Sequence, residues 1–430
     1  MRWGCIADDV TGATDLATAF VSRGLTAAVH FGVPGPGDLA QFEGLDVLVV
    51  ALKSRTASVT EAVRESLSAL EVLRSAGAER FYVKYCSTFD STPSGNIGPV
   101  IDAVLGQLGE TGTVVVPTFP DTGRTVYQGR LFVGSDPLDE SPMRDHPLTP
   151  MRDSSLLRLL EPQTENDVSL VPLQTVRQGS GVLRDELARL TASRHGGARL
   201  AVVDALDRED LATIMEASAG FKVVTGGSGL ALGIPAGDEV GARRIPRTPG
   251  RRAVLCGSAS ARTREQIASA QMLLPARKLD LDALRKDLPA EAERIVDWAR
   301  GLWSQDPNVI PLVFSAGSVE DLAEDRDIAS ALVEEALATI ADGMVRDGLR
   351  ELIVAGGETS GRIVQELGVR ALRIGPAISP GVAWANSTAA DGTSLSLALK
   401  SGNFGEREMF TTAWAALEGA TLPGEGTEER

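Results

Sequence analysis

The segment at residues 352–361, LIVAGGETSG, constrains the fold of this 430-residue chain more than any other. An apolar run suited to a buried parallel strand leads into two glycines, an acid, two hydroxyl residues and a third glycine, and helix-forming sequence follows at residues 362–367. A strand, a small-residue turn and a helix in this order direct backbone N–H groups and a positive helix end at an anion, usually a phosphate. The lysine of a P-loop is missing, and an ordinary tight turn is the alternative interpretation.

Two other segments of the same half repeat this pattern. Residues 253–260, AVLCGSAS, again run from a strand into a small hydroxyl turn, and helical sequence begins at Thr263. Residues 397–405, LALKSGNFG, end an apolar run in lysine, serine and two glycines. Three phosphate-compatible turns in one domain predict a nucleotide cleft at the carboxyl ends of a parallel sheet.

The composition limits the classes of protein and of partner. A chain of this length is expected to hold two or three domains, and few aromatics with many small aliphatic residues favour α/β layers. A formal net charge of −16 argues against nucleic acid and anionic membrane as partners, and no apolar run approaches the ~20 residues of a membrane span.

The cysteines and the N-terminus indicate the compartment. Cys5, Cys86 and Cys256 are odd in number and far apart, so they predict neither a disulfide framework nor a zinc site. A strand candidate lies within six residues of the N-terminus and leaves no room for a signal peptide. We therefore expect a cytoplasmic protein.

Charged and hydroxyl side chains follow the predicted strands of the first half, which are the apolar runs at residues 4–7, 47–52, 81–83 and 113–116. Because the carboxyl ends of parallel strands share one rim, we expect these side chains to lie together. Cations from separate strands suit a carboxylate ligand, and hydroxyl-rich turns suit a polyol. The groups are, in chain order, Asp8 and Asp9; Lys53 and Arg55; Lys84, Ser87 and Thr88; and Asp121 and Arg124.

Simpler interpretations exist for these groups. Asp8 or Asp9 would be an ordinary N-cap of the following helix, and most lysines and arginines are solvated surface charges. Asp15, one turn further on, is expected to be only a favourable first-turn acid.

The chain divides at an irregular stretch. Residues 233–252 carry glycine, proline and arginine without periodicity and are the predicted linker between domains at residues 1–232 and 253–430. Residues 127–152 look irregular and proline-rich, which suggests a functional loop or lid. The predicted fold is α/β with two domains, each a mostly parallel sheet with flanking helices, and an active site in the cleft between them.

The chain resembles the four-carbon acid sugar kinases, and within that family the 3-oxo-tetronate kinase branch. The resemblance runs over nearly the whole chain, from residues 6–12 (IADDVTG) to residues 400–405 (KSGNFG), and includes residues 84–93 (KYCSTFDSTP) and 120–133. Residues 96–100 (NIGPV) and 143–151 (MRDHPLTPM) resemble the 3-oxo-tetronate branch in particular.

The resemblance implies an N-terminal domain that binds an acid sugar and a C-terminal domain that binds ATP. The reaction implied is transfer of the γ-phosphoryl group to the terminal 4-hydroxyl of a 3-oxo-tetronate, with D-threonate and D-erythronate as alternative substrates. Mg²⁺ is the usual companion of ATP, and its protein ligands stay unidentified. The nucleotide-binding residues implied are Ser258, Gly356, Gly357, Glu358, Thr359, Ser360, Gly402 and Gly405.

Phosphoryl transfer requires alignment, charge neutralisation and a group that accepts the hydroxyl proton. We expect Asp9, or Asp8, to be that acceptor, because each is an acid at a strand end that opens a helix; Asp121 is the second choice. Lys400 is a potential charge partner of the phosphates. The expected substrate-binding residues are Arg55 and Lys84 on the carboxylate, Ser87 and Thr88 on the hydroxyls, and Arg124.

Three positions depart from the family pattern. Ala377 and Ser379 stand where acids are expected, and Arg130 stands where a histidine is expected. These positions bear on how magnesium is placed and on which acid is preferred.

Two other classes of function compete with the kinase. An NAD-linked hydroxy-acid oxidoreductase would need G-x-G-x-x-G in the first strand–helix turn, where Asp8 and Asp9 instead place negative charge. A non-catalytic ligand sensor is compatible with the fold. A homodimer is a possible assembly.

Overall fold

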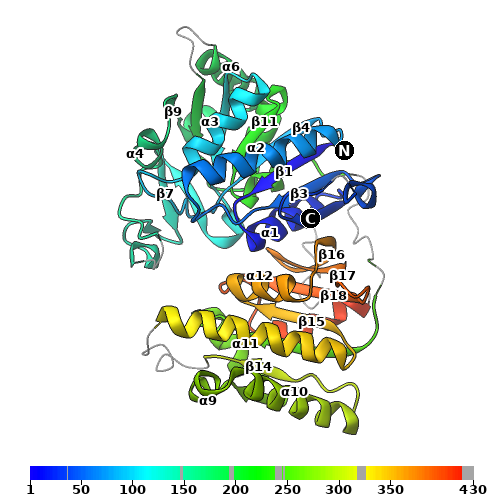
Figure 1. Ribbon diagram of the computed structural model, residues 1–430. Helices are drawn as coiled ribbons and strands as arrows, with labels where there is room; N and C mark the ends of the chain where they lie inside the picture. The colour runs from blue at the N-terminus through cyan, green and yellow to red at the C-terminus, as the bar shows by residue number, and fades with distance from the viewer. Residues whose placement is uncertain are drawn as a thin grey trace, which may run out of the picture. The chain divides into compact units, whose positions relative to one another are not determined.

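The computed structural model describes residues 1–35, 37–145, 149–192, 198–237, 245, 247–316 and 326–418. The chain divides into two compact units, Met1–Gly241 and Ala242–Arg430 (Figure 1). Parts of three sequence predictions lie outside the described residues. These parts are 238–244 and 246 of the predicted linker, and 146–148, which belong both to the second branch motif and to the proline-rich stretch at 127–152. Each unit is an α/β layer structure, as predicted from the alternation of apolar runs and helical segments.

The first unit contains one parallel sheet. Its strands are short apolar runs, such as the fully buried VLVVA of β3, because a parallel sheet is covered on both faces. The described strands lie in the order β2 (Ala27–Phe31), β3 (Val47–Ala51), β1 (Trp3–Ala7), β4 (Arg80–Lys84), β11 (Val223–Gly226), β5 (Gly112–Val116), β10 (Arg199–Val203) and β9 (Asp167–Val171), and every neighbouring pair is parallel.

Helices connect and cover these strands. Within the first unit α2 packs against α3, whereas α1 packs against the 3₁₀ helix η6, which also contacts α7. The helices are α1 (Val10–Ser22), α2 (Val59–Ser75), α3 (Ile97–Leu108), α4 (Leu156–Leu160), α5 (Leu173–Val176), α6 (Ser180–Thr191), α7 (Arg208–Ala217) and η6 (Ser228–Gly233).

A small antiparallel sheet occupies part of the stretch expected to be irregular. It consists of β6 (Arg124–Tyr127), β7 (Arg130–Val133) and β8 (Asp136–Pro137). Gln128 and Gly129 form the two-residue turn between β6 and β7, with φ of 53° and 67°. Two consecutive positive φ angles match the right-handed twist of the strands. Glutamine is an unusual residue for the first position, so the hairpin was not predicted from residue type.

The second unit contains a mixed sheet. Its first five strands are parallel, and the last two are added antiparallel as hairpins, which the sequence analysis did not anticipate. The described strands lie in the order β13 (Ala276–Lys278), β14 (Leu312–Phe314), β12 (Arg251–Cys256), β15 (Leu349–Ala355), β18 (Ser394–Lys400), β17 (Val382–Thr388) and β16 (Ala371–Ser379).

The helices of the second unit pack with its sheet and with one another. α11 contacts α10, α12 and β15. Among the described helices of the whole chain, none combines the length and the apolar character needed to cross a bilayer. The helices of this unit are α8 (Ala261–Ala270), α9 (Leu281–Lys286), α10 (Leu288–Gln305), α11 (Arg326–Arg346), α12 (Gly357–Glu366), α13 (Met409–Thr412) and α14 (Trp414–Glu418).

A tryptophan-rich core fixes the central strands of the second unit. Trp384 on β17 is fully buried, donates its indole N–H to the carbonyl of Ala413 at 2.8 Å, and lies 5.3 Å from Trp414 between ring centroids. Cys256 and Ala355, the last residues of β12 and β15, belong to the same buried cluster. The carboxyl ends of these strands therefore stand on a close-packed base.

Candidate active site

The carboxyl ends of β1, β3 and β4 form a charged rim in the first unit. Ala7, the last residue of β1, is paired in register with Ala51 of β3 and Lys84 of β4. Asp8 continues this arrangement: its N–H donates to the carbonyl of Lys84 at 3.2 Å, and its carbonyl accepts the N–H of Ser54 at 3.1 Å. The prediction that strand ends bring these residues together is confirmed for the ends of β1, β3 and β4.

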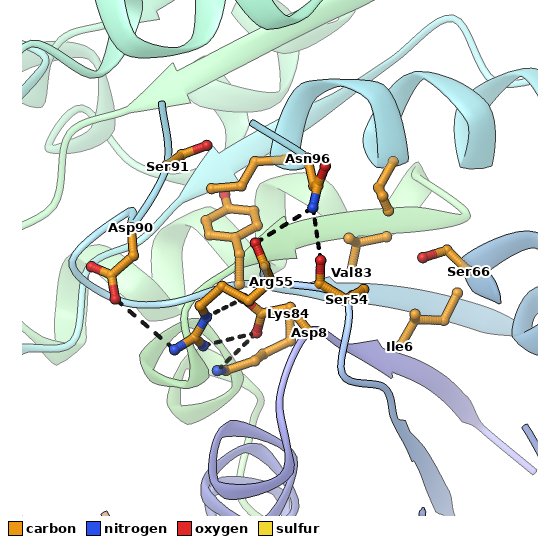
Figure 2. A pocket seen from close by; sticks show the side chains of 13 residues that line it. Ile6, Asp8, Ser54, Arg55, Ser66, Val83, Lys84, Asp90, Ser91 and Asn96 are labelled. Atoms are coloured by element: carbon orange, nitrogen blue, oxygen red, sulfur yellow. Dashed lines mark hydrogen bonds and ion pairs between the residues drawn. The ribbon is translucent and has the colours of Figure 1, made fainter. Parts of the chain in front are cut away.

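Two carboxylates and two cations meet on this rim. Figure 2 shows three of them, Asp8, Arg55 and Lys84. Arg55 donates from Nε to Asp8 Oδ2 at 2.8 Å, and its Nη2 lies 3.0 Å from Asp9 Oδ1. Lys84 Nζ lies 3.2 Å from Asp9 Oδ1 and 3.5 Å from Asp8 Oδ1. We call Asp8, Asp9, Arg55 and Lys84 the charge cluster. Its formal charges balance, so the two cations already have acidic partners before any ligand binds.

Asp9 also caps α1. It is therefore both the N-cap residue of that helix and a member of the charge cluster. Its Oδ1 accepts the N–H of Gly12 at 3.0 Å, and its Oδ2 accepts the hydroxyl of Thr11 at 3.1 Å. Burial alone would raise the pKa of Asp9, but the charges of Lys84 and Arg55 outweigh it and hold the pKa well below its usual value. Burial likewise opposes the charge of Lys84, yet Asp9 and Asp8 raise its pKa. Both groups therefore stay ionised near neutral pH.

A glycine makes room for this pairing. A Cβ atom on Gly12 would lie 1.8 Å from Lys84 Nζ and 2.1 Å from Asp9 Oδ1. Any side chain at position 12 would therefore occupy the space of the ammonium group and force Lys84 away from the acid.

A pocket lies beside the charge cluster, and Ile97 and Val100 of α3 contribute to its apolar wall, whereas α2 contributes the polar Ser66. Asp90 lies on its rim, where its Oδ2 is 3.9 Å from Arg55 Nη1 and its Oδ1 accepts the hydroxyl of Thr88 at 2.6 Å. Asn96 donates from Nδ2 to the carbonyl of Ser54 at 2.7 Å and so fixes the loop that carries Arg55 (Figure 2). The lining residues are Ile6, Asp8, Ser54, Arg55, Ser66, Val83, Lys84, Tyr85, Asp90, Ser91, Asn96, Ile97 and Val100.

Asp90 and Asn96 were absent from the predicted site residues. Both lie in segments that had been singled out as motifs, but no strand ends immediately before them, so counting residues from strand ends did not select them. The signal that would have found Asp90 is that it is the only acid in the hydroxyl-rich segment at residues 84–93.

The other predicted substrate-binding residues, Ser87, Thr88 and Arg124, differ in how much of their hydrogen-bonding capacity is already used. Thr88 is buried and committed to Asp90, and the backbone of Ser87 lies so close to Gly227 that a Cβ there would be 3.3 Å from the Cα of Ser87. Arg124 donates from Nη1 to the carbonyl of Thr122, whereas its buried Nε has no hydrogen-bond partner among the described residues. Arg124 therefore keeps one donor for a further acceptor.

Asp121 does not join the charge cluster. Both of its oxygens are engaged by the exposed Arg208 of α7, at 2.9 Å from Nε and 2.5 Å from Nη2. Of the three acids considered as proton acceptors, Asp8 and Asp9 lie together and Asp121 is drawn to another partner.

Asp15 is the acid that the sequence analysis placed wrongly. It is not a solvated first-turn residue, because it lies in the middle of α1 with 6% of its surface exposed. Burial raises its pKa to about 6, although the charge of Lys84 lowers it in part. Its Oδ1 and the hydroxyl of Ser228 have no hydrogen-bond partner within the described residues. The available signal was that Asp15 is the only charged residue at positions 10–22.

A glycine-rich turn at residues 226–229, at the carboxyl end of β11, holds Ser228 in place. Cβ atoms on Gly227 and Gly229 would lie 2.7 Å and 2.3 Å from the carbonyl oxygens of Pro117 and Thr118. The turn thus packs directly on the backbone after β5, which fixes Ser228 beside Asp15.

A second rim is formed by the glycine and serine turns of the second unit. β12, β15 and β18 are neighbours, and their last residues are paired in register, Cys256 with Ala355 and Ala355 with Lys400. The three turns predicted from the sequence therefore start at the same level of one sheet. We call these turns, residues 257–260, 356–360 and 401–405, the glycine–serine rim.

The turns of the glycine–serine rim touch through backbone and small side chains. The carbonyl of Gly402 accepts the hydroxyls of Ser260 at 2.6 Å and Thr263 at 2.9 Å. A Cβ atom on Gly402 would lie 2.5 Å from the hydroxyl oxygen of Ser258. Gly356 has φ of +129°, and a Cβ there would lie 3.1 Å from the amide nitrogen of Ser258. Larger residues at these glycines would push the turns apart.

Helix α12 begins at Gly357, five residues before the helical segment expected from the sequence. Thr359 and Ser360 are buried within its first turn, and Glu358 lies in the same turn. The first N–H groups of a helix have no partner inside it, so residues 357–359 present backbone donors at the sheet edge. Gly405, with φ of +86°, closes the third turn against Met409 and Gln266.

The described residues contain no preformed metal cage. Among them, no three histidine, cysteine, aspartate or glutamate side chains gather closely enough to hold a metal ion. Mg²⁺ typically keeps several waters and binds through nucleotide phosphates with one or two carboxylates, so the site is compatible with an ion that arrives with its nucleotide.

Comparison with known proteins identifies relatives along the whole chain. Residues 3–234 match a family model described as a sugar-binding N-terminal domain, and residues 253–410 match a nucleotide-binding C-terminal domain. The 3-oxo-tetronate kinase of Burkholderia multivorans is 44% identical over 430 residues, with 97% of each chain covered. That of Cupriavidus necator is 44% identical over 427 residues, again with 97% of each chain covered.

A crystal structure has the same fold. It comes from a Salmonella typhimurium LT2 protein, provisionally named a tRNA synthase, that is 41% identical and superimposes with a TM-score of 0.85, covering 95% of this chain and 98% of the other. A curated relative from the same strain, 41% identical, is a 3-oxo-tetronate kinase. The chain therefore belongs to the four-carbon acid sugar kinase family.

Proposed function

We propose that this protein is an ATP-dependent kinase that phosphorylates the terminal 4-hydroxyl of a 3-oxo-tetronate. In this proposal residues 1–232 bind the acid sugar and residues 253–430 bind ATP. The observation that carries it is the presence in one chain of two chemically different rims at the carboxyl ends of parallel strands. One is built from charged side chains, and the other from glycine, serine and threonine.

The charged rim suits a small polyhydroxylated acid. Arg55 and Lys84 supply positive charge to the substrate carboxylate, and Asp8 and Asp9 hold these cations in fixed positions. Arg124 has the buried Nε without a partner in the described residues, so it can donate to a further substrate oxygen. In this proposal Ser87 is the hydroxyl residue that binds a substrate hydroxyl, whereas Thr88 acts by holding Asp90 in place. Charge-assisted hydrogen bonds from several elements give an acid of this size both affinity and orientation.

Asp9 is the proposed proton acceptor. Its side chain is 28% exposed, against 17% for Asp8, so it is the more accessible carboxylate of the cluster. In the reaction the 4-hydroxyl oxygen bonds to the γ-phosphorus, the bond from that phosphorus to the bridging oxygen breaks, ADP leaves, and Asp9 takes the hydroxyl proton. A low pKa is compatible with this role, because phosphoryl transfer depends mainly on positioning and charge stabilisation.

The glycine–serine rim suits the phosphates. Backbone N–H groups at the start of α12, the hydroxyl of Ser258 and the close approach permitted by Gly402 make a surface that an oxyanion can reach without steric conflict. When bound, Mg²⁺ would neutralise phosphate charge, held mainly by phosphate oxygens and water. Dependence on ATP makes the cytoplasm the expected compartment.

A coupled assay of ADP release tests the proposal. Purified protein with Mg²⁺ and ATP would be offered 3-oxo-tetronates, D-threonate and D-erythronate, and the product's phosphate position would be determined by phosphorus and proton NMR. We expect the highest kcat/KM with a 3-oxo-tetronate and a 4-phosphate product. Preference for D-threonate or D-erythronate would change the substrate but keep the kinase. Reduction of NAD by a hydroxy acid would show that the protein is an oxidoreductase and not a kinase. Ligand binding without turnover would show that it is a sensor.

A further inference from the structure

Lys400 is a fully buried lysine under the glycine–serine rim. It is the last residue of β18, and none of its surface is exposed. Its Nζ donates to the hydroxyl of Thr263 at 3.0 Å and to the carbonyl of Gly402 at 3.0 Å. Both partners are neutral, and no carboxylate within the described residues pairs with this ammonium group.

The surroundings do not compensate the charge. Burial lowers the pKa of Lys400 to about 8; the thiol of Cys256 on β12 acts in the opposite direction, and Arg262 on α8 lowers the pKa further. A buried cation without an acidic partner destabilises the folded state, and such groups are retained mainly where the charge has a use.

The position of Lys400 indicates that use. Its carbonyl accepts the N–H of Gly356 at 2.9 Å, and its Nζ reaches the turn of Gly402 two residues further on. Thr263, its other partner, donates to the same carbonyl of Gly402. Lys400 therefore contacts two of the three turns directly and the start of α8 through Thr263, from the buried side of the rim.

We propose that Lys400 is a positioning residue that holds the turn of Gly402 in its phosphate-binding conformation and supplies a buried positive charge that is neutralised only when nucleotide phosphates bind. The inference rests on the proposed nucleotide site. It adds a residue that does not itself touch the phosphates, because its Nζ lies behind the carbonyl of Gly402 and the hydroxyl of Thr263.

Binding and stability measurements on Lys400→Met test this role. Methionine keeps much of the side-chain length and removes the charge. We expect the Kd for ADP and for ATP to rise at least tenfold, the Kd for adenosine to stay within about twofold, and the urea midpoint of the nucleotide-free protein to stay equal or to increase. Lys222→Met is the matched control, because Lys222 is 60% exposed and pairs with Glu110 in the first unit; its nucleotide affinities should not change.

If Lys400 only stabilised the fold, Lys400→Met would change stability and nucleotide affinity in a different way. In that case Lys400→Met would lower the urea midpoint and weaken adenosine and ADP alike, and the inference would be overturned. Equal ADP affinity in Lys400→Met and the parent protein would also overturn it.

The pH dependence of the parent protein provides a second measurement that needs no folded variant. Phosphate binding favours the protonated lysine, so the Kd for ADP should rise between pH 7 and pH 9, as the free protein loses this proton. The second phosphate ionisation, near pH 6, is already complete in this range. A Kd for ADP that is flat across this range overturns the inference. In Lys400→Met, if it folds, the Kd for ADP should not change between pH 7 and pH 9. In Lys222→Met it should rise with pH as in the parent protein.

These outcomes separate the inference from the proposed function. If the parent protein binds ATP and turns over an acid sugar while Lys400→Met matches it, only the role of Lys400 is wrong. If the parent protein binds neither ATP, ADP nor adenosine, the nucleotide site and the role of Lys400 are both wrong.

Discussion

Lys84 Nζ lies 3.2 Å from Asp9 Oδ1, although 75 positions separate the two residues in the chain. They meet because β1 and β4 are paired in parallel with Ala7 opposite Lys84, so Asp9 and the lysine emerge at the same edge. Arg55, from the loop after the neighbouring β3, completes the balance of charge. Removal of any one charge therefore leaves an uncompensated partner at a partly buried site.

Replacement of Asp9 by asparagine should lower kcat by roughly 10²-fold or more and leave the Kd for ATP nearly unchanged. Asparagine removes the proton acceptor but still caps a helix, so α1 should remain formed. Steady-state kinetics measure kcat, and calorimetric titration with ATP in the absence of an acid sugar measures the Kd. Wild-type turnover in Asp9→Asn would remove Asp9 from the role.

Replacement of Arg55 by lysine should raise the KM for the acid sugar about tenfold or more. The guanidinium contacts Asp8 and Asp9 at once through different nitrogens, and a single ammonium group cannot reproduce that fork. Arg64→Lys on the exposed side of α2 is the control, since Arg64 is 64% exposed. An unchanged KM in Arg55→Lys would show that the fork has no part in substrate binding.

Replacement of Gly402 by alanine should weaken ATP binding about tenfold or more while the KM for the acid sugar stays unchanged. The new Cβ would lie 2.5 Å from the hydroxyl oxygen of Ser258 and 2.9 Å from that of Ser260, so the turn has to shift. Gly361→Ala is the matched control in α12, because a Cβ there meets nothing within 4 Å and alanine favours a helix by about 1 kcal/mol. Equal loss of ATP affinity in both variants would contradict a steric effect at residue 402.

Asp15 should make the stability of the protein depend on pH between about 4 and 6. Its pKa in the folded chain, about 6, is higher than the ordinary 3.8, so the folded state binds more protons in this range. The contribution of this group to stability is therefore lost as pH rises to about 6. Asp15→Asn should gain stability relative to the parent over that window, by up to about 3 kcal/mol.

Urea unfolding at a series of pH values measures this difference. Asp136→Asn is the control, because Asp136 is exposed on β8. Curves of unfolding free energy against pH that run parallel for Asp15→Asn and the parent would contradict a buried, protonatable Asp15.

The parts of the fold that the sequence predicted are those set by short-range pattern. The apolar run at residues 47–52 became β3 (Val47–Ala51), and that at 113–116 became β5 (Gly112–Val116). An unbroken apolar run bounded by polar residues has few other stable arrangements, so these strands and the turns after them were accessible to local reasoning.

What the sequence did not predict depends on tertiary packing. α12 begins at Gly357 although Thr359 and Ser360 are poor helix formers; both are buried, and Thr359 lies against Gly257 of the neighbouring turn. β16 and β17 join the sheet antiparallel, a choice made by their connections and not by their composition. Asp15 is buried because α1 packs against η6, which is distant in sequence.

The candidate site likewise contains residues that the sequence predicted correctly and one that it did not. Sequence position relative to a strand end was sufficient to group Asp8, Asp9, Arg55 and Lys84. It was not sufficient to show that Asp121 pairs with Arg208, because that partner lies 87 residues further along the chain.

The absent side chain at residue 12 has a consequence for experiments on turnover. A single methyl group there would fill the space that the Lys84 ammonium needs, while the paired strands and the glycine–serine rim lie elsewhere. Gly12→Ala would thus impair the acid-sugar rim at the cost of one carbon atom and leave the nucleotide turns unaltered. Such a protein would be suited to measuring nucleotide affinity on its own, apart from any contribution of the acid sugar.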